Sequence, residues 1–424
     1  MGDGDEGDFW STAPAEGYSV CADCFDDLDI QAFIASSVDE LACDFCDKSS
    51  ADGPVAAPLE GVVEFMVQAI DREYDRAVNA LGWESAEGGF QGSHWDSNEL
   101  LTEQIDIALP SDDGRLLDIL VDCLGDNDWC ERNPYSLRED ERYIASWEQY
   151  CNFIKYERRY FFLEPQRQRP ETGDGELLSP PSLLQFISET VVDYRLLTTI
   201  PTGSIIYRAR QLKPGQTVRS SLDFGPPPVE KATRSNRMSP AGIVMFYGSG
   251  ETDTAVAEID DKPELGIAVG TFRTLRDLRV VDLTRLPRPL RFFEPQPETS
   301  IENRYVLSFL NNFGASLAAR VEPGDREHID YVPTQVVTEW FRTTPLDNEP
   351  NIDGILYRST QRAGGSSLVL FADQSKIAFS EDEVAASRRE PGRGHFDYLD
   401  LAQRQRHGWL QLTGSNFIRQ PQPI

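Results

Sequence analysis

The chain has 424 residues, of which 40% are hydrophobic and 10% aromatic, so it can bury a sizeable core and is not wholly disordered. Its length indicates two or three domains. Asp and Glu number 71 against 40 Lys and Arg, and the formal net charge of −31 disfavours binding of DNA or RNA by the surface as a whole, although a local basic pocket can still hold a small anion.

The sequence also argues against membrane insertion and secretion. No run of about 18 apolar residues occurs, so we expect no membrane span. Residues 1–6 are acidic and lack the basic region and apolar core of a secretory signal. We therefore expect a cytoplasmic protein. The sequence indicates no oligomeric state.

Residues 1–55 contain two Cys-x2-Cys pairs that are separated by eighteen residues. Two thiolate pairs of this kind form a closed tetrahedral sulfur site, which suits a structural Zn²⁺ and leaves no open position for catalysis. Because this segment is short and acidic, metal binding would supply much of its folding free energy. The predicted ligands are Cys21, Cys24, Cys43 and Cys46. We expect the other cysteines, Cys123, Cys130 and Cys151, to be ordinary thiols.

Residues 56–165 are predicted to form an all-helical middle domain. Apolar residues recur at helical spacing over 58–82, and again over 138–163. Shorter helices are expected at 98–107 and 114–124. The stretch 165–180 has Pro, Gln, Arg and Gly but no periodicity, so we place a domain boundary there.

Residues 180–390 mix strands and helices without a strict βαβ rhythm, which predicts an α+β domain. We expect strands at 204–208, 243–247, 266–273, 278–283, 353–357 and 367–372, and helices at 181–197, 251–260, 301–313 and 334–343. The tail, residues 391–424, is rich in Arg and Gln and has no predicted role.

Several common catalytic motifs are missing from the sequence. There is no G-x-x-x-x-G-K-[ST] loop, no H-E-x-x-H and no G-x-S-x-G. Asp253 follows Gly248-Ser249-Gly250 where a dinucleotide fingerprint needs Gly. P-loop, Rossmann, metalloprotease-like and serine-hydrolase chemistries are therefore disfavoured.

Four short patches of the α+β region carry residues suited to chemistry. Tyr207 and Arg208 end an apolar strand, and Arg237 lies in a polar loop before the strand that ends in Tyr247. Glu258 lies inside a small apolar run, which favours partial burial. Ser359 follows Asp353-Gly354 and a strand, and Ser366-Ser367 begin the next strand.

At these patches the chain resembles the RES family, named for its Arg, Glu and Ser. The family pattern has an Arg after a first strand, a Gly-Arg-Trp-Asn loop, a Tyr ending the next strand, a Glu in the following helix and a D-G-I-x-Y-x-S segment. The matches, in order, are Arg208, Arg237, Tyr247, Glu258 and Ser359. The stretch 331–335 also resembles longer family members.

Two departures from the family pattern are present. The loop reads Ser235-Asn236-Arg237-Met238-Ser239, without the Trp and the Asn that follows it. The Asn that usually precedes the final strand is replaced by Ser366 or Ser367.

The region upstream resembles the HEPN-like N-terminal region that accompanies some RES domains. HEPN nucleases carry an R-x4-6-H motif, but the only histidine of this region, His94, has no Arg at that spacing before it. Arg389 and His395 fit the spacing but lie near the tail. We therefore interpret the upstream region as regulatory or as an interaction domain rather than as an RNase.

RES domains are similar in fold to ADP-ribosyltransferases of the diphtheria-toxin type, and the resemblance implies NAD⁺ as a substrate, not a cofactor. Arg208 and Arg237 would contact the phosphates or ribose, and Tyr247 would stack on nicotinamide. Tyr207 and Ser367 would make further substrate contacts. Glu258 would stabilise the oxocarbenium-like centre left by nicotinamide, and Ser359 would orient the substrate. Glu258, Arg208 and Ser359 are thus the expected catalytic residues.

The resulting prediction is an NAD⁺ glycohydrolase or phosphorylase that acts as a toxin or immune effector. Its N-terminal domains would restrain it or bind a partner such as an antitoxin or a regulatory protein. A mono-ADP-ribosyltransferase with a macromolecular acceptor is one alternative. A non-catalytic protein that senses NAD or ADP-ribose is the other.

Overall fold

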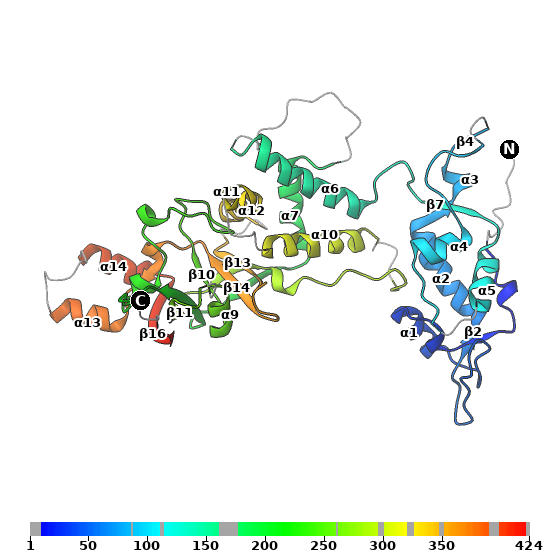
Figure 1. The fold of residues 1–424 in the computed structure, drawn as a ribbon, viewed down its shortest axis with the longest axis horizontal. Helices are drawn as coiled ribbons and strands as arrows, with labels where there is room; N and C mark the ends of the chain where they lie inside the picture. Colours follow the sequence, from blue (N-terminus) through cyan, green and yellow to red (C-terminus); the bar gives the residue numbers. More distant parts are fainter. Residues whose placement is uncertain are drawn as a thin grey trace. The chain divides into compact units, whose positions relative to one another are not determined.

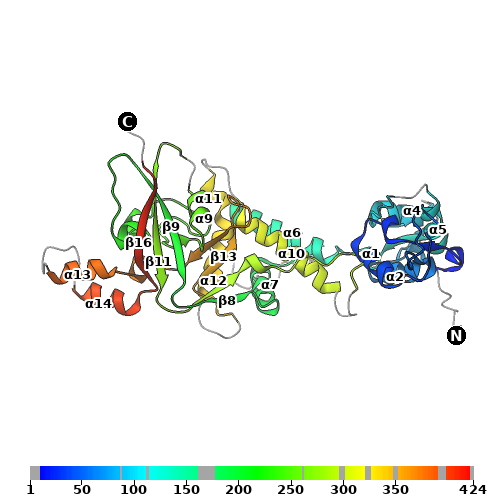
Figure 2. The same ribbon diagram turned by 90° about the horizontal axis from the view of Figure 1, so that it is seen from below.

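The computed structural model describes residues 10–85, 88–110, 114–160, 177–259, 262–295, 301–319, 326–346, 352–389 and 398–420 (Figures 1 and 2). The chain divides into two compact units. Unit 1 comprises Met1–Glu141 and Pro289–Ser308, and unit 2 comprises Arg142–Arg288 and Phe309–Ile424. Among the described residues, no helix combines the length and apolarity that crossing a bilayer requires.

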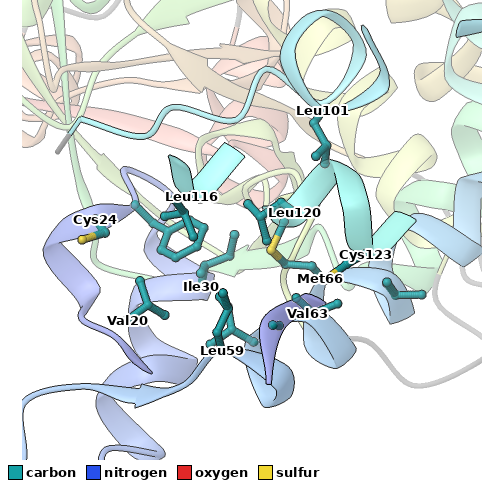
Figure 3. Close-up of a cluster of buried hydrophobic side chains, with 14 of the residues drawn as sticks. Val20, Cys24, Ile30, Leu59, Val63, Met66, Leu101, Leu116, Leu120 and Cys123 are labelled. Atoms are coloured by element: carbon teal, nitrogen blue, oxygen red, sulfur yellow. The ribbon is translucent and has the colours of Figure 1, made fainter. Parts of the chain in front are cut away.

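The core of unit 1 is helical. It is formed by α1 (Leu28–Ser36), α2 (Leu59–Glu73) and α5 (Arg115–Leu124). On α2, Val63, Met66 and Ile70 form the apolar stripe that the sequence predicts, and all three are buried. Figure 3 shows this core, with Cys24 at its margin.

The middle region is not all-helical. The predicted helix over 58–82 stops at Glu73, because Tyr74–Arg76 becomes extended as β3 and pairs with β7 (Asp128–Glu131). Tertiary pairing here overrides the helical periodicity of the sequence. The remaining short elements of this region are β6 (Trp95–Asp96), which also pairs with β7, the β4–β5 pair (Trp83–Glu84 and Gly89–Phe90), α3 (Ala77–Ala80), α4 (Ser97–Glu99) and a π-helix at Leu100–Gln104.

A segment from much later in the sequence completes unit 1. Phe293 is buried in the same apolar core. The guanidinium of Arg291 donates to both carboxylate oxygens of Asp29, over 2.6 and 2.5 Å. Arg304 pairs with Glu73. Residues 289–308 therefore belong with the N-terminal region, although they lie between elements of the α+β region in the sequence.

Unit 2 begins with a layer of helices. α6 (Glu139–Asn152) and α10 (Ile301–Ala318) each begin in unit 1 and continue into unit 2. The two helices lie side by side in Figures 1 and 2, with the rings of Trp147 and Phe313 edge to face at 5.2 Å. The other members of the layer are the π-helix Phe153–Glu157, α7 (Pro180–Asp193), α11 (Glu327–Asp330) and α12 (Val332–Thr343).

Two sheets form the rest of unit 2, which has the predicted α+β composition. The five-stranded sheet has the order β10-β14-β13-β12-β8 and the four-stranded sheet has the order β15-β16-β11-β9. Their bounds are β8 (Leu197–Ile200), β9 (Ile205–Leu212), β10 (Phe246–Gly248), β11 (Gly266–Thr274), β12 (Leu278–Asp282), β13 (Gly354–Arg358), β14 (Ser366–Leu370), β15 (Ile377–Ala378) and β16 (Leu410–Arg419). The short helices α8 (Ser221–Phe224) and α9 (Thr252–Ala257) connect strands. A bridge between Tyr207 and Ser249 brings β9 beside the end of β10.

The tail supplies a strand to the second sheet. After α13 (Glu381–Arg389) and α14 (Tyr398–His407), β16 pairs with β11 along its whole length. Leu410 and Leu412 are buried. The same β11 pairs on its other side with β9, which carries Arg208. Leu410–Arg419 of the tail is thus part of the sheet that supports the candidate site. His395 lies outside the described residues.

Candidate active site and metal centre

Unit 2 contains a cavity of about 420 Å³, which lies between strands of the two sheets on one side and α11 on the other. Its walls come from β9, the loop before β10, the end of α9, α11 and the strands β13 and β14. The lining residues that carry polar or charged groups are Arg208, Arg210, Arg234, Ser235, Asn236, Arg237, Tyr247, Glu258, Glu327, Tyr331, Tyr357, Gln361 and Ser367.

Two of the lining arginines project from β9. Arg208 and Arg210 are two residues apart on a strand and therefore point to the same face. Arg208 is 7% exposed, and its Nη1 donates to the carbonyl of Tyr247 over 2.6 Å. Burial, with repulsion from Arg210, holds the pKa of Arg208 well below its usual range. Burial also lowers the pKa of Arg210, which donates to the carbonyl of Gly225. A bound anion would relieve both penalties.

Arg237 extends from the loop before β10. Its guanidinium carbon lies 5.7 Å from the centre of the Tyr357 ring, and its Nε and Nη1 are buried without a hydrogen-bond partner among the described residues. Met238, which replaces the Trp of the family pattern, is fully buried. Ser239, which replaces the Asn, shares a 2.9 Å hydrogen bond with the Tyr247 hydroxyl. The altered loop residues thus face the protein interior and Tyr247.

Glu258 follows the last residue of α9 and is held by two hydroxyl groups. Its Oε1 accepts hydrogen bonds from Ser359 Oγ over 2.6 Å and from Ser367 Oγ over 2.9 Å. Both serines come from the β13–β14 segment, about a hundred residues further along the chain. Ser367, rather than Ser366, is therefore the serine at the site. The other oxygen, Oε2, accepts no hydrogen bond from a described residue.

Two tyrosines of the cavity remain neutral phenols. Desolvation raises the pKa of Tyr247 to about 12, although the hydrogen bond with Ser239 acts against it. Tyr357 is 4% exposed, and burial raises its pKa well above the ordinary value. Both rings therefore stay protonated near neutral pH.

Most of the predicted site residues meet in this cavity. Arg208, Arg237, Tyr247, Glu258 and Ser367 line it, and Ser359 reaches it through Glu258.

Tyr207 does not line the cavity. It points to the opposite face of β9 from Arg208 and packs against an apolar cluster that includes Ala255 and Val269. Its ring packs in this cluster, whereas Ala209, on the same face of β9, does line the cavity.

The sequence did not identify several of the residues that line the cavity. Both Arg210 and Tyr357 had a detectable signal. Tyr357 is the Tyr of the D-G-I-x-Y-x-S segment, and Arg210 lies two positions from Arg208 on the same strand face. Tyr331 begins the 331–335 stretch that resembles longer family members, whereas Arg234, Glu327 and Gln361 come from loops and a short helix that no periodicity marks.

The four predicted zinc ligands form one cluster in unit 1. Their sulfur atoms all lie within 4.8 Å of one another, with separations of 3.8 Å (Cys21–Cys24), 3.5 Å (Cys21–Cys46) and 3.6 Å (Cys24–Cys43). Disulfides need about 2.05 Å, whereas four sulfurs about 2.3 Å from one Zn²⁺ are roughly 3.8 Å apart. Burial raises the pKa of the Cys21 thiol to about 11. The donor set fits a metal ion, whose charge would favour the thiolates.

Family models match two separate parts of the chain. The model HEPN/RES N-terminal domain 1 matches residues 36–168, and the model RES domain matches residues 205–391. The chain carries a RES domain. Every predicted residue of the cavity lies inside the RES match, whereas β16 lies beyond it. The N-terminal match includes Cys43 and Cys46 but starts after Cys21 and Cys24.

A RES domain indicates a toxin-type, NAD-related function in general. No curated protein and no solved structure gives a significant match to the chain.

Proposed function

We propose that the RES domain cleaves the nicotinamide–ribose bond of NAD⁺ and that the 420 Å³ cavity is the substrate site. The observation that carries the proposal is the composition of this cavity: four arginines and the serine-held carboxylate of Glu258 line one space. NAD⁺ combines a doubly negative pyrophosphate with a cationic nicotinamide ring. The two kinds of charge in the cavity match the two kinds of charge in this substrate.

The arginines are suited to the pyrophosphate. Guanidinium groups bind phosphate oxygens in pairs. Arg208 and Arg237 have buried nitrogen atoms without a hydrogen-bond partner among the described residues, and the same is true of Arg210 Nε. Burying unpaired donors costs free energy, so a ligand that accepts from them gains that energy on binding. Tyr247 offers a flat neutral ring for stacking on nicotinamide.

Glu258 is suited to the bond-breaking step. When the C–N bond breaks, nicotinamide leaves with the bonding electrons and the ribose carbon becomes oxocarbenium-like. A carboxylate held in place by Ser359 and Ser367 stabilises that positive charge without having to reorient. Water then forms the new C–O bond and releases a proton, which gives ADP-ribose. With phosphate as nucleophile, the product is ADP-ribose carrying a phosphate on the same ribose carbon.

Nicotinamide release from NAD⁺ by the purified full chain tests the proposal. Rapid release without an added macromolecule, with ADP-ribose as the second product, supports a glycohydrolase. A phosphate-dependent rate and a phosphorylated product support a phosphorylase. Release only in the presence of a macromolecule that becomes modified indicates a transferase, and binding without release indicates a sensor. The first of these two results overturns water or phosphate as the acceptor of ADP-ribose, and the second overturns cleavage of NAD⁺ by this chain.

For unit 1 we propose a structural role for the metal ion, with Zn²⁺ bound by Cys21, Cys24, Cys43 and Cys46. Four sulfur ligands in tetrahedral geometry favour zinc and leave no site for a reacting water. On this proposal the N-terminal region restrains the RES domain or binds an antitoxin or regulatory protein, and the chain acts in the cytoplasm as a toxin or immune effector. Metal analysis of the purified protein tests the zinc assignment.

A further inference from the structure

The guanidinium of Arg237 has no hydrogen bond of its own that fixes it. It makes none to a described residue, and two of its nitrogens are buried. The loop that carries it, residues 234–239, has no regular secondary structure and is closed by Asn236 N donating to Ser239 O over 2.8 Å. The direction of the Arg237 side chain therefore depends on its contact with the Tyr357 ring and on how the loop backbone is held.

Helix α12 holds this backbone on both sides of Arg237. Gln335 Nε2 donates to the carbonyl of Asn236 over 2.7 Å, and Thr334 Oγ1 donates to the carbonyl of Arg237 over 2.6 Å. These two carbonyls belong to the two planar peptide groups that flank the Cα of Arg237. With both planes held, the backbone dihedral angles of Arg237 have little freedom.

A third side chain of the same helix face holds the next residue. Thr338 Oγ1 lies 3.1 Å from the sulfur of Met238. All three helix residues are buried, with exposed fractions of 7% for Thr334, 5% for Gln335 and 0% for Thr338. Buried polar groups on a helix need partners, and here the partners are three successive loop residues.

A purely structural role explains the two threonines better than it explains the glutamine. Thr334 also lies 2.9 Å from the carbonyl of Tyr331, and Thr338 lies 2.7 Å from the carbonyl of Thr334, so both hydroxyls have partners within the helix. The Gln335 amide has its hydrogen bond only to Asn236 among the described residues. The hydrogen bond to the loop is therefore what satisfies the buried amide of Gln335.

We propose that Gln335 and Thr334 are positioning residues for Arg237, which direct its guanidinium at the phosphate or ribose of the nucleotide. This inference rests on the proposed function in assigning Arg237 a contact with the nucleotide. It gives a role to the Thr-Gln pair of the 331–335 stretch, which the cavity itself leaves unexplained.

Isosteric variants of the full chain test the proposal. Gln335→Met and Thr334→Val keep the volume of each side chain and remove the hydrogen bond to the loop, whereas Thr334→Ser keeps the hydroxyl. Thr343→Val is the matched control, because Thr343 lies on the same helix, is exposed, and bonds only within the helix, to Glu339 O. The dissociation constant of ADP-ribose is measured by calorimetry, and KM and kcat are measured from nicotinamide release.

We expect Gln335→Met and Thr334→Val each to weaken ADP-ribose binding and to raise KM by roughly tenfold, with a smaller change in kcat. Thr334→Ser and Thr343→Val should match the wild type. In the Arg237→Ala background the same changes should have almost no further effect, since their target is gone. Thermal unfolding of each variant shows whether it is folded.

The outcomes separate this proposal from the proposed function. Losses that add fully to that of Arg237→Ala, or wild-type affinity in Gln335→Met, overturn the positioning role. A wild-type protein that binds ADP-ribose but releases no nicotinamide overturns the proposed function, and the binding cycle still decides the positioning role. A wild-type protein that binds neither NAD⁺ nor ADP-ribose overturns both.

Discussion

Replacement of Glu258 by Gln is the sharpest perturbation of the proposed chemistry. The change keeps the shape of the side chain and removes only its charge. The two serine hydroxyls that donate to Oε1 can donate equally to the amide oxygen of Gln. Among the described residues, Glu258 is bound by these two hydroxyls and not by a guanidinium, so no arginine loses a partner. The fold should therefore tolerate the change, with a stability difference of about 1 kcal/mol or less.

The effect on catalysis should be far larger. Removing one preorganised electrostatic contact of this class costs on the order of 100- to 1,000-fold in kcat, or about 3–4 kcal/mol. The charge acts mainly on the oxocarbenium-like transition state, so KM for NAD⁺ should change much less than kcat. Initial rates of nicotinamide release, measured by chromatography, give both constants, and thermal unfolding by circular dichroism checks the fold.

Glu230→Gln is the matched control, because Glu230 is an exposed glutamate of the same domain, in the short helical turn Val229–Lys231, and does not line the cavity. It should retain wild-type kcat and KM. A folded Glu258→Gln protein that keeps more than about a tenth of the wild-type kcat would refute the role assigned to the carboxylate.

Four further predictions test other parts of the structure. Ser359→Ala and Ser367→Ala should each lower kcat by about tenfold. The double variant should lose less kcat than the product of the two single losses, because both hydroxyls donate to one oxygen. A loss equal to that product would contradict this prediction. Because the pKa of Tyr247 is raised to about 12, this phenol ionises between pH 10 and 12 only in the unfolded state. Over that range the free energy of unfolding of the wild type, measured in urea, should fall by up to about 2–3 kcal/mol more than that of Tyr247→Phe. Parallel pH profiles of the two proteins would show that Tyr247 is not desolvated. We expect the wild type to hold one zinc ion per chain, as measured by atomic absorption. Cys43→Ser should abolish zinc binding and make unit 1 sensitive to protease. An unchanged metal content would show that Cys43 is not a ligand. Leu410→Ala should lower the free energy of unfolding of unit 2 by about 2–4 kcal/mol in denaturant, because Leu410 is fully buried on β16; a neutral effect would mean that β16 is not part of the domain.

The sequence predicted those features that depend on local pattern. The Cys-x2-Cys spacing placed four sulfurs within 4.8 Å of one another. The order of Arg208, Arg237, Tyr247, Glu258 and Ser359 matched the family pattern, and the fold brings these residues to one cavity. The periodicity of α2 was also readable, because it reflects burial of one helix face, and so was the strand character of β11 and β13, because each is a short, largely buried run of apolar residues.

The features that the sequence did not predict depend on pairing between distant segments. The helix over 58–82 stops at Tyr74 because β3 pairs with β7, more than fifty residues later. β16 is a strand because β11 offers it an edge, and its own residues are largely exposed and weakly patterned. Tyr207 was predicted to contact the substrate because it neighbours Arg208 in sequence, but its ring packs in the apolar cluster with Ala255 and Val269 and does not line the cavity.

The most direct test of the account is the stoichiometry of products formed from NAD⁺ by the purified wild-type chain. The account predicts that one nicotinamide appears for every NAD⁺ consumed, together with one ADP-ribose or one phosphorylated ADP-ribose, with no macromolecule added. Intact NAD⁺ after prolonged incubation with a folded, zinc-loaded protein, over a range of phosphate concentrations, would contradict it.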